Sequence, residues 1–91
     1  MKDTETTRFQ IKPEKDREAR RIIGVVLRAL REKGYDPVSQ LVGYFLSDDP
    51  TYITNYEGAR GVIRQMERYE LLEVIIQDYI NNSIEQPEDR E

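Results

Sequence analysis

The sequence predicts an all-α fold, a compact small helical domain with four longer helices and one short helical turn. Apolar residues recur at helical spacing between residues 19 and 80, and no segment shows the strict alternation that is typical of a strand. Two Asp-Pro steps, at Asp36 and Asp49, each predict a helix start, because an Asp side chain caps a helix and a proline fits its first position. A chain of 91 residues is expected to form one domain.

The first two helices are predicted from these signals. The segment from Pro13 to Lys33 is expected to be helical, and Gly34 suits the left-handed position directly after a helix end. Its apolar stripe consists of Ala19, Ile22, Ile23, Val26 and Leu30. The second helix is expected from Asp36-Pro37 to about Leu46, with Val38, Leu41, Val42 and Phe45 as its buried face.

The second half of the chain is predicted to contain a short turn and two further helices. Asp49-Pro50 begins the turn, which runs through Ile53. Thr54 and Glu57 match a capping box, which predicts a helix over residues 55–68. Its inward residues are expected to be Ala59, Ile63 and Met66. The last helix is predicted over residues 69–82, with Leu72, Ile75, Ile76, Tyr79 and Ile80 on one side.

The distribution of polar residues predicts three regions. Residues 1–12 are expected to form a flexible arm, residues 13–82 a helical regulatory domain, and residues 83–91 an acidic disordered tail. The net charge of −4 is uneven: residues 1–33 carry +4, residues 34–68 carry −2 and residues 69–91 carry −6. A core of this size is often marginally stable, and dimerisation is one remedy.

Composition excludes several classes of function. The chain has no cysteine and no histidine, which removes thiol nucleophiles, the usual hydrolytic triads and the commonest metal ligand. Asp48 and Asp49 are adjacent carboxylates, and we interpret them as a helix cap with a solvated neighbour rather than a catalytic pair. We therefore expect a non-enzymatic protein without cofactor or metal. The apolar runs are short, which predicts a cytoplasmic protein without membrane insertion.

Two groups of residues are candidates for function. Arg60, Arg64 and Arg68 recur every four residues, which places all three on one face of the predicted helix. Such a stripe is either a solvated face or a surface that binds anions or a partner, because guanidinium groups bind carboxylate and phosphate in a bidentate fork. The second group is the arm's threonines, where a phosphate would add about −1.5 to −2 charge. They are Thr4, Thr6 and Thr7.

One continuous block of the sequence resembles a known family. The run Lys-Gly-Tyr-Asp-Pro-Val-Ser-Gln-Leu-Val-Gly-Tyr at residues 33–44, followed by Leu-Ser, Asp-Pro and Tyr-Ile at residues 46–53, is similar to the central signature of the IreB/ReoM family of bacterial regulatory phosphoproteins. The similarity continues through the Arg60, Arg64 and Arg68 segment. Departures from the family pattern include Asp48 in place of a glycine, Thr54-Asn55 in place of Pro-Arg, and Tyr69 in place of an aspartate.

The resemblance implies a small helical homodimer without catalytic activity. It implies phosphorylation of an N-terminal threonine by a membrane Ser/Thr kinase with PASTA repeats, reversed by a cognate phosphatase. It further implies control of the envelope enzyme UDP-N-acetylglucosamine 1-carboxyvinyltransferase through Clp proteolysis, relieved by phosphorylation. By position, Thr6 fits the family's acceptor best, with Thr7 and Thr4 as alternatives, and the three arginines fall on the family's functional arginines.

Two other classes of function remain as alternatives. The Asp36-Pro37 turn would also suit a small helix-turn-helix-like nucleic-acid-binding module. The acidic net charge and the lack of a dense basic helix argue against binding of nucleic acid. A small enzyme is the third possibility, and the absence of His, Cys and a phosphate-binding glycine loop argues against it.

Overall fold

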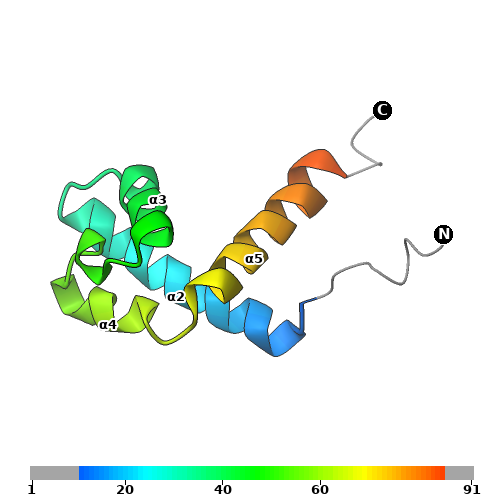
Figure 1. Ribbon diagram of the computed structural model, residues 1–91, viewed down its shortest axis with the longest axis horizontal. Helices are drawn as coiled ribbons and strands as arrows, with labels where there is room; N and C mark the ends of the chain where they lie inside the picture. Colours follow the sequence, from blue (N-terminus) through cyan, green and yellow to red (C-terminus); the bar gives the residue numbers. More distant parts are fainter. Residues whose placement is uncertain (1–10, 86–91) are drawn as a thin grey trace.

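The structure is a computed structural model that describes residues 11–85, and this part of the chain is all-α, as the sequence predicts. Figure 1 shows α3 and α4 gathered around the C-terminal half of α2, while α5 crosses the N-terminal half of α2 and extends away from α3. The helices are α2 (Pro13–Glu32), α3 (Pro37–Ser47), α4 (Ala59–Ile63) and α5 (Arg68–Tyr79). Three short helical segments join or extend them: η1 (Pro50–Tyr52), η2 (Tyr56–Gly58) and η3 (Ile80–Ile84).

The α2 helix begins and ends where the sequence predicts. Pro13 occupies its first turn, where a missing backbone N–H costs nothing. At the other end, Gly34 has a φ of +82°, which glycine adopts without strain. The amide of Tyr35 then donates to the carbonyl of Leu30 at 2.9 Å, which satisfies one of the last free carbonyls of the helix.

The two Asp-Pro steps behave differently. At Asp49 the predicted cap is confirmed, since its carboxylate accepts hydrogen bonds from the amide of Thr51 at 3.0 Å and from the Thr51 hydroxyl at 2.7 Å. These bonds lower the pKa of Asp49. At Asp36 the predicted side-chain cap is wrong, because the carboxylate accepts from the Ser39 hydroxyl at 2.7 Å and from no backbone amide of α3.

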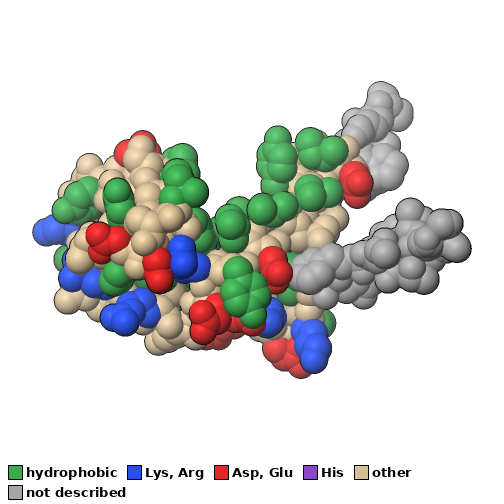
Figure 2. Space-filling view, viewed as in Figure 1, with side chains coloured by type: hydrophobic (Ala, Val, Ile, Leu, Met, Phe, Trp, Pro, Cys, Tyr) green, Lys and Arg blue, Asp and Glu red, His purple; other side chains and the backbone are tan. Residues whose placement is uncertain are grey.

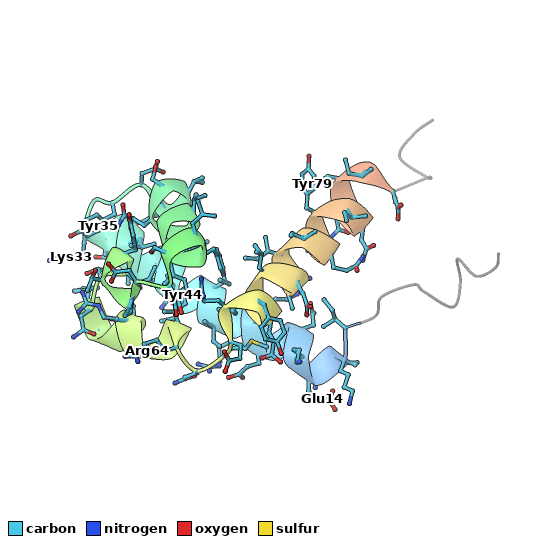
Figure 3. The ribbon with its side chains drawn as sticks, viewed as in Figure 1. Glu14, Lys33, Tyr35, Tyr44, Arg64 and Tyr79 are labelled. Carbon is cyan, nitrogen blue, oxygen red and sulfur yellow. The ribbon has the colours of Figure 1, made fainter. Side chains whose placement is uncertain are left out.

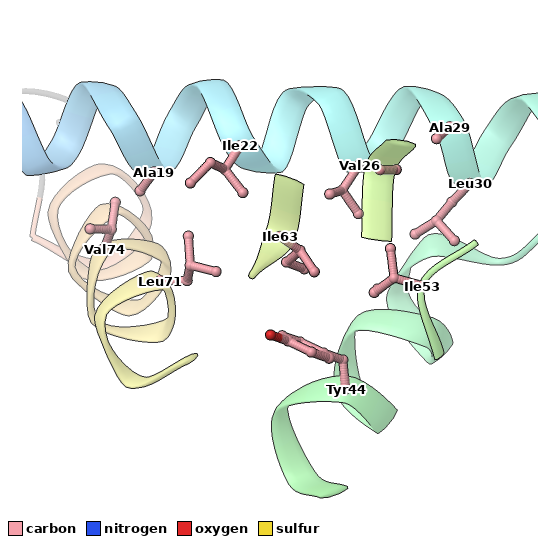
Figure 4. Close-up of a cluster of buried hydrophobic side chains, with 11 residues drawn as sticks. Ala19, Ile22, Val26, Ala29, Leu30, Tyr44, Ile53, Ile63, Leu71 and Val74 are labelled. Carbon is pink, nitrogen blue, oxygen red and sulfur yellow. The ribbon is translucent and has the colours of Figure 1, made fainter. Parts of the chain in front are cut away.

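One hydrophobic core joins all four helices. Figure 4 shows side chains of α2 directed toward those of α3, α4, α5 and the η1 segment. The largest completely buried side chains are Ile22, Val26, Leu30, Ile53, Ile63 and Leu71. Ile11, two residues before α2, packs against this core from outside. The predicted α2 stripe and the predicted inward positions Ala59 and Ile63 are therefore confirmed.

The predicted helix over residues 55–68 is wrong in length. The structure has the short turn η2, a five-residue α4, and a non-helical connection before α5. Two successive left-handed residues interrupt the chain, Glu57 with φ +52° and Gly58 with φ +77°. The predicted capping box does not form either, because the Thr54 hydroxyl accepts from the amide of Tyr56 at 3.2 Å instead of from the Glu57 amide.

The predicted buried face of α3 is confirmed only at Leu41 and Phe45, which pack against the core, and the predicted apolar side of the last helix is largely exposed. In α3, Val38 and Val42 are 70% and 50% exposed, and Tyr44 is the buried residue. In α5, Leu71 and Val74 face the core, whereas every exposed residue of the helix is apolar or aromatic: Tyr69, Leu72, Ile76 and Tyr79. The reason is that each helix contacts the rest of the described chain along a narrow strip, so part of its apolar surface has nothing to cover it. Figure 2 shows hydrophobic side chains gathered over both helices.

Ion pairs also attach α5 to α2. Lys15 of the first turn of α2 pairs with Glu70 of the first turn of α5. Further along, Arg20 bridges Asp16 at 2.9 Å and Asp78 at 2.8 Å. The helical path then continues through η3 to Ile84, two residues beyond the predicted end at Asn82. None of the helices within residues 11–85 is long and apolar enough to span a membrane.

Candidate functional site

The three arginines of the predicted stripe do not share one helical face. Arg60 belongs to α4, Arg64 lies directly after the last residue of α4, and Arg68 is the first residue of α5. The reason is that α4 ends at Ile63, so residues 64–67 connect two helices instead of continuing one. The structure therefore distributes the arginines over an α4–α5 corner, and their environments differ.

Two of these arginines bind the backbone of the protein itself. Arg60 donates through Nε to the carbonyl oxygen of Ile53 at 2.9 Å, and it is half-buried. Arg68 donates through Nη1 to the carbonyl oxygen of Phe45 at 2.7 Å, and its Nε lies 2.9 Å from Oδ1 of Asp48. Arg60 therefore braces the η1 segment, and Arg68 joins the end of α3 to the start of α5.

Arg64 is different, because it is exposed and forms no hydrogen bond or ion pair with any of residues 11–85. Figure 3 labels Arg64 near Tyr44, at the end of the molecule that holds α3 and α4. A guanidinium has five N–H donors in a planar fork that matches carboxylate and phosphate. Among the three predicted partner-binding arginines, only Arg64 therefore has all of its guanidinium N–H donors without a partner in residues 11–85.

Arg64 lines a cleft of about 390 Å³ between the end of α3 and the start of α5. Arg68 lies in the same cleft, whereas Arg60 does not line it. The remaining lining residues are Tyr44, Phe45, Asp48, Met66, Glu67, Tyr69 and Leu72. The cleft therefore combines two arginines with two carboxylates, two tyrosines and an apolar wall.

Tyr44 is the buried polar residue of this cleft. Its side chain is 3% exposed, and its hydroxyl makes no hydrogen bond to residues 11–85. The hydroxyl is not sealed in the core, because the described residues contain no fully covered side-chain nitrogen or oxygen without a partner. Figure 4 shows the Tyr44 ring directed away from α3, with its oxygen at the far end. The hydroxyl is thus a free hydrogen-bonding group at the wall of the cleft.

Burial keeps the Tyr44 hydroxyl protonated. Loss of hydration is the main cause that raises the pKa of Tyr44, and the nearby Asp48 carboxylate raises it further. Arg68 and Arg64 oppose this rise in the pKa, because a nearby positive charge favours the ionised phenol. At neutral pH the hydroxyl is therefore a neutral donor beside two cations.

Asp48 and Tyr44 are site residues that the sequence interpretation missed. Asp48 ends α3 with a φ of +63°, a left-handed conformation that glycine adopts without strain. Its carboxylate then engages Arg68, so it is not a merely solvated neighbour of Asp49. The signal for Asp48 was its departure from the family pattern. For Tyr44 the helical spacing of the apolar residues gave no signal.

The candidate phosphorylation sites Thr4, Thr6 and Thr7 lie outside the described residues 11–85, as does most of the predicted arm. The predicted acidic tail lies outside them from residue 86 onward. Within the described part of the chain, no group of three acidic side chains is placed to hold a metal ion.

Comparison with known proteins identifies the family. A model of the IreB regulatory phosphoprotein family matches residues 4–81. This chain belongs to the IreB regulatory phosphoprotein family. A relative named UPF0297 protein from Ruminiclostridium cellulolyticum is 51% identical over 84 residues, which cover 92% of this chain and 96% of the relative. A second UPF0297 protein, from Acetivibrio thermocellus, is also 51% identical over 84 residues, which cover 92% of this chain and 93% of the relative.

The IreB family match confirms the resemblance seen in the sequence, and its range covers the candidate residues of both groups. It includes the three arm threonines and the three arginines. It also includes Tyr44 and Asp48, the two further residues of the cleft.

Proposed function

We propose that this chain is a non-enzymatic regulator of cell-envelope (peptidoglycan) homeostasis that is switched by phosphorylation of its N-terminal arm. The observation that carries the proposal is the match to a regulatory phosphoprotein family over residues 4–81, a range that includes the arm threonines. Thr6 is the preferred acceptor, because it lies three residues before Phe9 in the setting that resembles the family's acceptor, with Thr7 and Thr4 as alternatives.

The proposed pathway follows from the same family membership. A Ser/Thr kinase with PASTA repeats adds the phosphate and a cognate phosphatase removes it. The unmodified protein, acting in the cytoplasm, promotes Clp-dependent turnover of UDP-N-acetylglucosamine 1-carboxyvinyltransferase, and phosphorylation relieves this action. This proposal requires no cofactor, metal or nucleic acid.

The proposed partner surface is the α4–α5 corner, with Arg64 as its main contact. Arg60 and Arg68 hold the backbone of this corner in place through their bonds to Ile53 and Phe45. Arg64 remains available for a carboxylate or phosphate of a partner protein. The three arginines thus divide between two tasks, since two of them position the surface and the third makes the contact.

The exposed apolar residues support a homodimer. The solvent-facing side of α5 consists of Tyr69, Leu72, Ile76 and Tyr79, and α3 adds Val38, Val42 and Leu46. An apolar surface of this kind usually marks an interaction site. A second copy is the proposed occupant, because the described core is small and dimerisation supplies the burial that it lacks.

The first experiment asks whether the arm is phosphorylated. The full chain and its Thr6→Ala variant are incubated with a PASTA-type kinase domain, and intact-mass and peptide mass spectrometry locate any phosphate. We expect one phosphate on the wild type and its loss in Thr6→Ala. Unmodified protein, or a phosphate confined to the helical domain, would contradict the proposed switch.

A binding measurement then tests the surface. Immobilised UDP-N-acetylglucosamine 1-carboxyvinyltransferase and Clp components are probed with the unmodified chain, with Arg64→Glu and with the matched control Arg28→Glu. Arg28 is exposed on α2 and has no ion pair with the described residues, so it controls for the charge change alone. We expect Arg64→Glu to weaken binding at least tenfold and Arg28→Glu to leave it unchanged. Equal binding by all three proteins would exclude the α4–α5 corner.

A further inference from the structure

Three hydrogen-bond donors of the α3–α5 cleft lack a complete set of partners in the described structure. Arg64 has no partner there, and the Tyr44 hydroxyl has none although its side chain is 97% enclosed. The third donor is the start of α5, where Glu67 provides no side-chain cap for the first amides of the helix. Glu67, Arg68 and Tyr69, which form this helix start, all line the cleft.

These donors together suit an anion. The first amides of a helix have no intrahelical acceptor, and the N-terminus carries a partial positive charge. A phosphate accepts several hydrogen bonds at once and pairs with guanidinium in a bidentate fork. Tyr44 supplies a neutral hydroxyl donor from the buried side of the cleft, and Arg64 supplies a full charge from the exposed side.

We propose that this cleft binds the phosphate carried by Thr6 in the chain's own N-terminal arm, residues 1–10. The proposal rests on the proposed function in one respect, namely that Thr6 is phosphorylated. It adds the receptor for that phosphate, made of Arg64, Tyr44 and the start of α5.

The position at which the arm joins the fold supports this occupant. Ile11 packs against the core, and the Lys15–Glu70 pair places the first turn of α2 beside the first turn of α5. Thr6 lies five positions before Ile11, so the two residues can be up to about 17 Å apart when the chain is extended. A helix with its side chains is about 10–12 Å wide. Ile11 lines a groove with Val74 and Gln77 of α5, so the arm would have to pass around α5 to the cleft, and its extended length exceeds the width of that helix.

The charges of the arm and the cleft are complementary as well. Asp48 is already neutralised by Arg68 at 2.9 Å, so it opposes a phosphate less than a free carboxylate would. Glu67 is the other carboxylate of the cleft, and the arm carries Arg8 two residues after Thr6. Phe9 follows Arg8, and the cleft offers Phe45 and Leu72 as an apolar wall. The phosphate, the Arg8 guanidinium and the Phe9 ring of the arm thus each have a complementary group in the cleft.

Docking of the phosphate would also explain how the switch works. The phosphate on Thr6 would occupy Arg64, which is the proposed partner contact. Phosphorylated protein would then lose its partner by competition within its own chain, without any change in the helical core.

The test uses the full chain with phosphothreonine incorporated at position 6 during synthesis, so that no kinase is needed. Phosphorus NMR follows the second ionisation of the phosphate, whose pKa is about 6 when the group is free. A neighbouring cation favours the dianion, so we expect the phosphate pKa to fall by about one unit in the wild type. Arg64→Gln should return it to the free value, and Tyr44→Phe should reverse part of the shift.

Controls make the result specific. Arg28→Gln removes an exposed arginine of α2 that does not line the cleft, and the phosphate pKa should stay at its wild-type value. The helical circular dichroism spectrum of each variant establishes that the fold is intact. A phosphate that titrates near pH 6 in the wild type, or that responds equally to Arg28→Gln and Arg64→Gln, would overturn the docking proposal. The proposed function would survive that result, since kinase modification and partner binding are measured separately.

Discussion

The two ends of this molecule are held together by different forces. Around the C-terminal half of α2, the side chains of Val26, Leu30, Ile53 and Ile63 are completely buried, and α3, η1 and α4 close over them. At the other end, α5 contributes the buried Leu71 and Val74 and is otherwise attached to α2 by two sets of ion pairs. Its exposed residues are all apolar or aromatic.

This difference shows how a small chain can combine a stable fold with an exposed surface that is suited to binding. Apolar burial stabilises the first end, because about 25 cal/mol is gained per Å² of apolar surface removed from water. The second end keeps its apolar surface uncovered and relies on partly exposed ion pairs, which contribute little individually. The cleft with Arg64 and Tyr44 lies at the junction of the two ends, where the end of α3 meets the start of α5.

The largest expected effect is a loss of stability at the first end. Ile63→Ala should lower the free energy of unfolding by about 2–5 kcal/mol, because it leaves a cavity at a completely buried position. The same truncation at Ile76, which is 49% exposed, should change it by about 0.5 kcal/mol or less in dilute protein. Urea denaturation followed by circular dichroism measures both values.

The milder Ile63→Val variant keeps this comparison measurable if Ile63→Ala does not fold. It should lower the free energy of unfolding by about 0.5–1.5 kcal/mol. Equal losses for the truncations at Ile63 and Ile76 would mean that α5 is as tightly enclosed as α4, and the contrast between the two ends would be wrong.

The second expected effect concerns self-association through α5. Ile76→Lys places a charge in the middle of the exposed apolar stripe, so we expect the dissociation constant of the homodimer to rise at least tenfold. Asn55→Lys is the matched control, because Asn55 is exposed in the connection before η2, and it should leave association unchanged. Analytical ultracentrifugation over a range of concentrations measures the constant. A monomeric wild type, or a dimer insensitive to Ile76→Lys, would exclude this surface as the dimer interface.

The fold class and the starts of α2, α3 and η1 could be predicted from the sequence, because they depend on local signals. Helical periodicity, Pro13, Gly34 and Asp49 act within a few residues of their own positions, and each was confirmed. The faces of α3 and α5 could not be predicted in the same way. Periodicity shows that a helix has an apolar stripe, but it does not show which part of a wide stripe the rest of the chain covers.

The sequence allowed us to predict which arginines belong to the candidate site, but not how they are arranged in space. The spacing of Arg60, Arg64 and Arg68 implied one helical face, which required a continuous helix from residue 60 to residue 68. Two left-handed residues, Glu57 and Gly58, delay the start of α4, and the helix then ends at Ile63. The left-handed conformation of Glu57 has no strong sequence signal, since glutamate usually favours a helix. The division of the arginines into two braces and one free contact follows from this break.

The smallest expected effect tests the junction between the two ends. Asp48 has a left-handed backbone, which favours glycine, and its carboxylate pairs with Arg68 across the junction. Asp48→Gly loses the ion pair with Arg68, whose contribution is small because the aspartate is mostly exposed. It also removes the strain of a Cβ in the left-handed region, so the two changes in the free energy of unfolding should nearly cancel. Asp48→Ala loses the same pair and keeps a Cβ in the left-handed region, so it should be less stable than Asp48→Gly by about 1 kcal/mol. Thermal and urea denaturation of the three proteins measure this order. Equal stability of the alanine and glycine variants would show that the end of α3 relaxes out of the left-handed conformation. Arg68 would then not need Asp48 to join α3 to α5, because its bond to the Phe45 carbonyl would hold the junction.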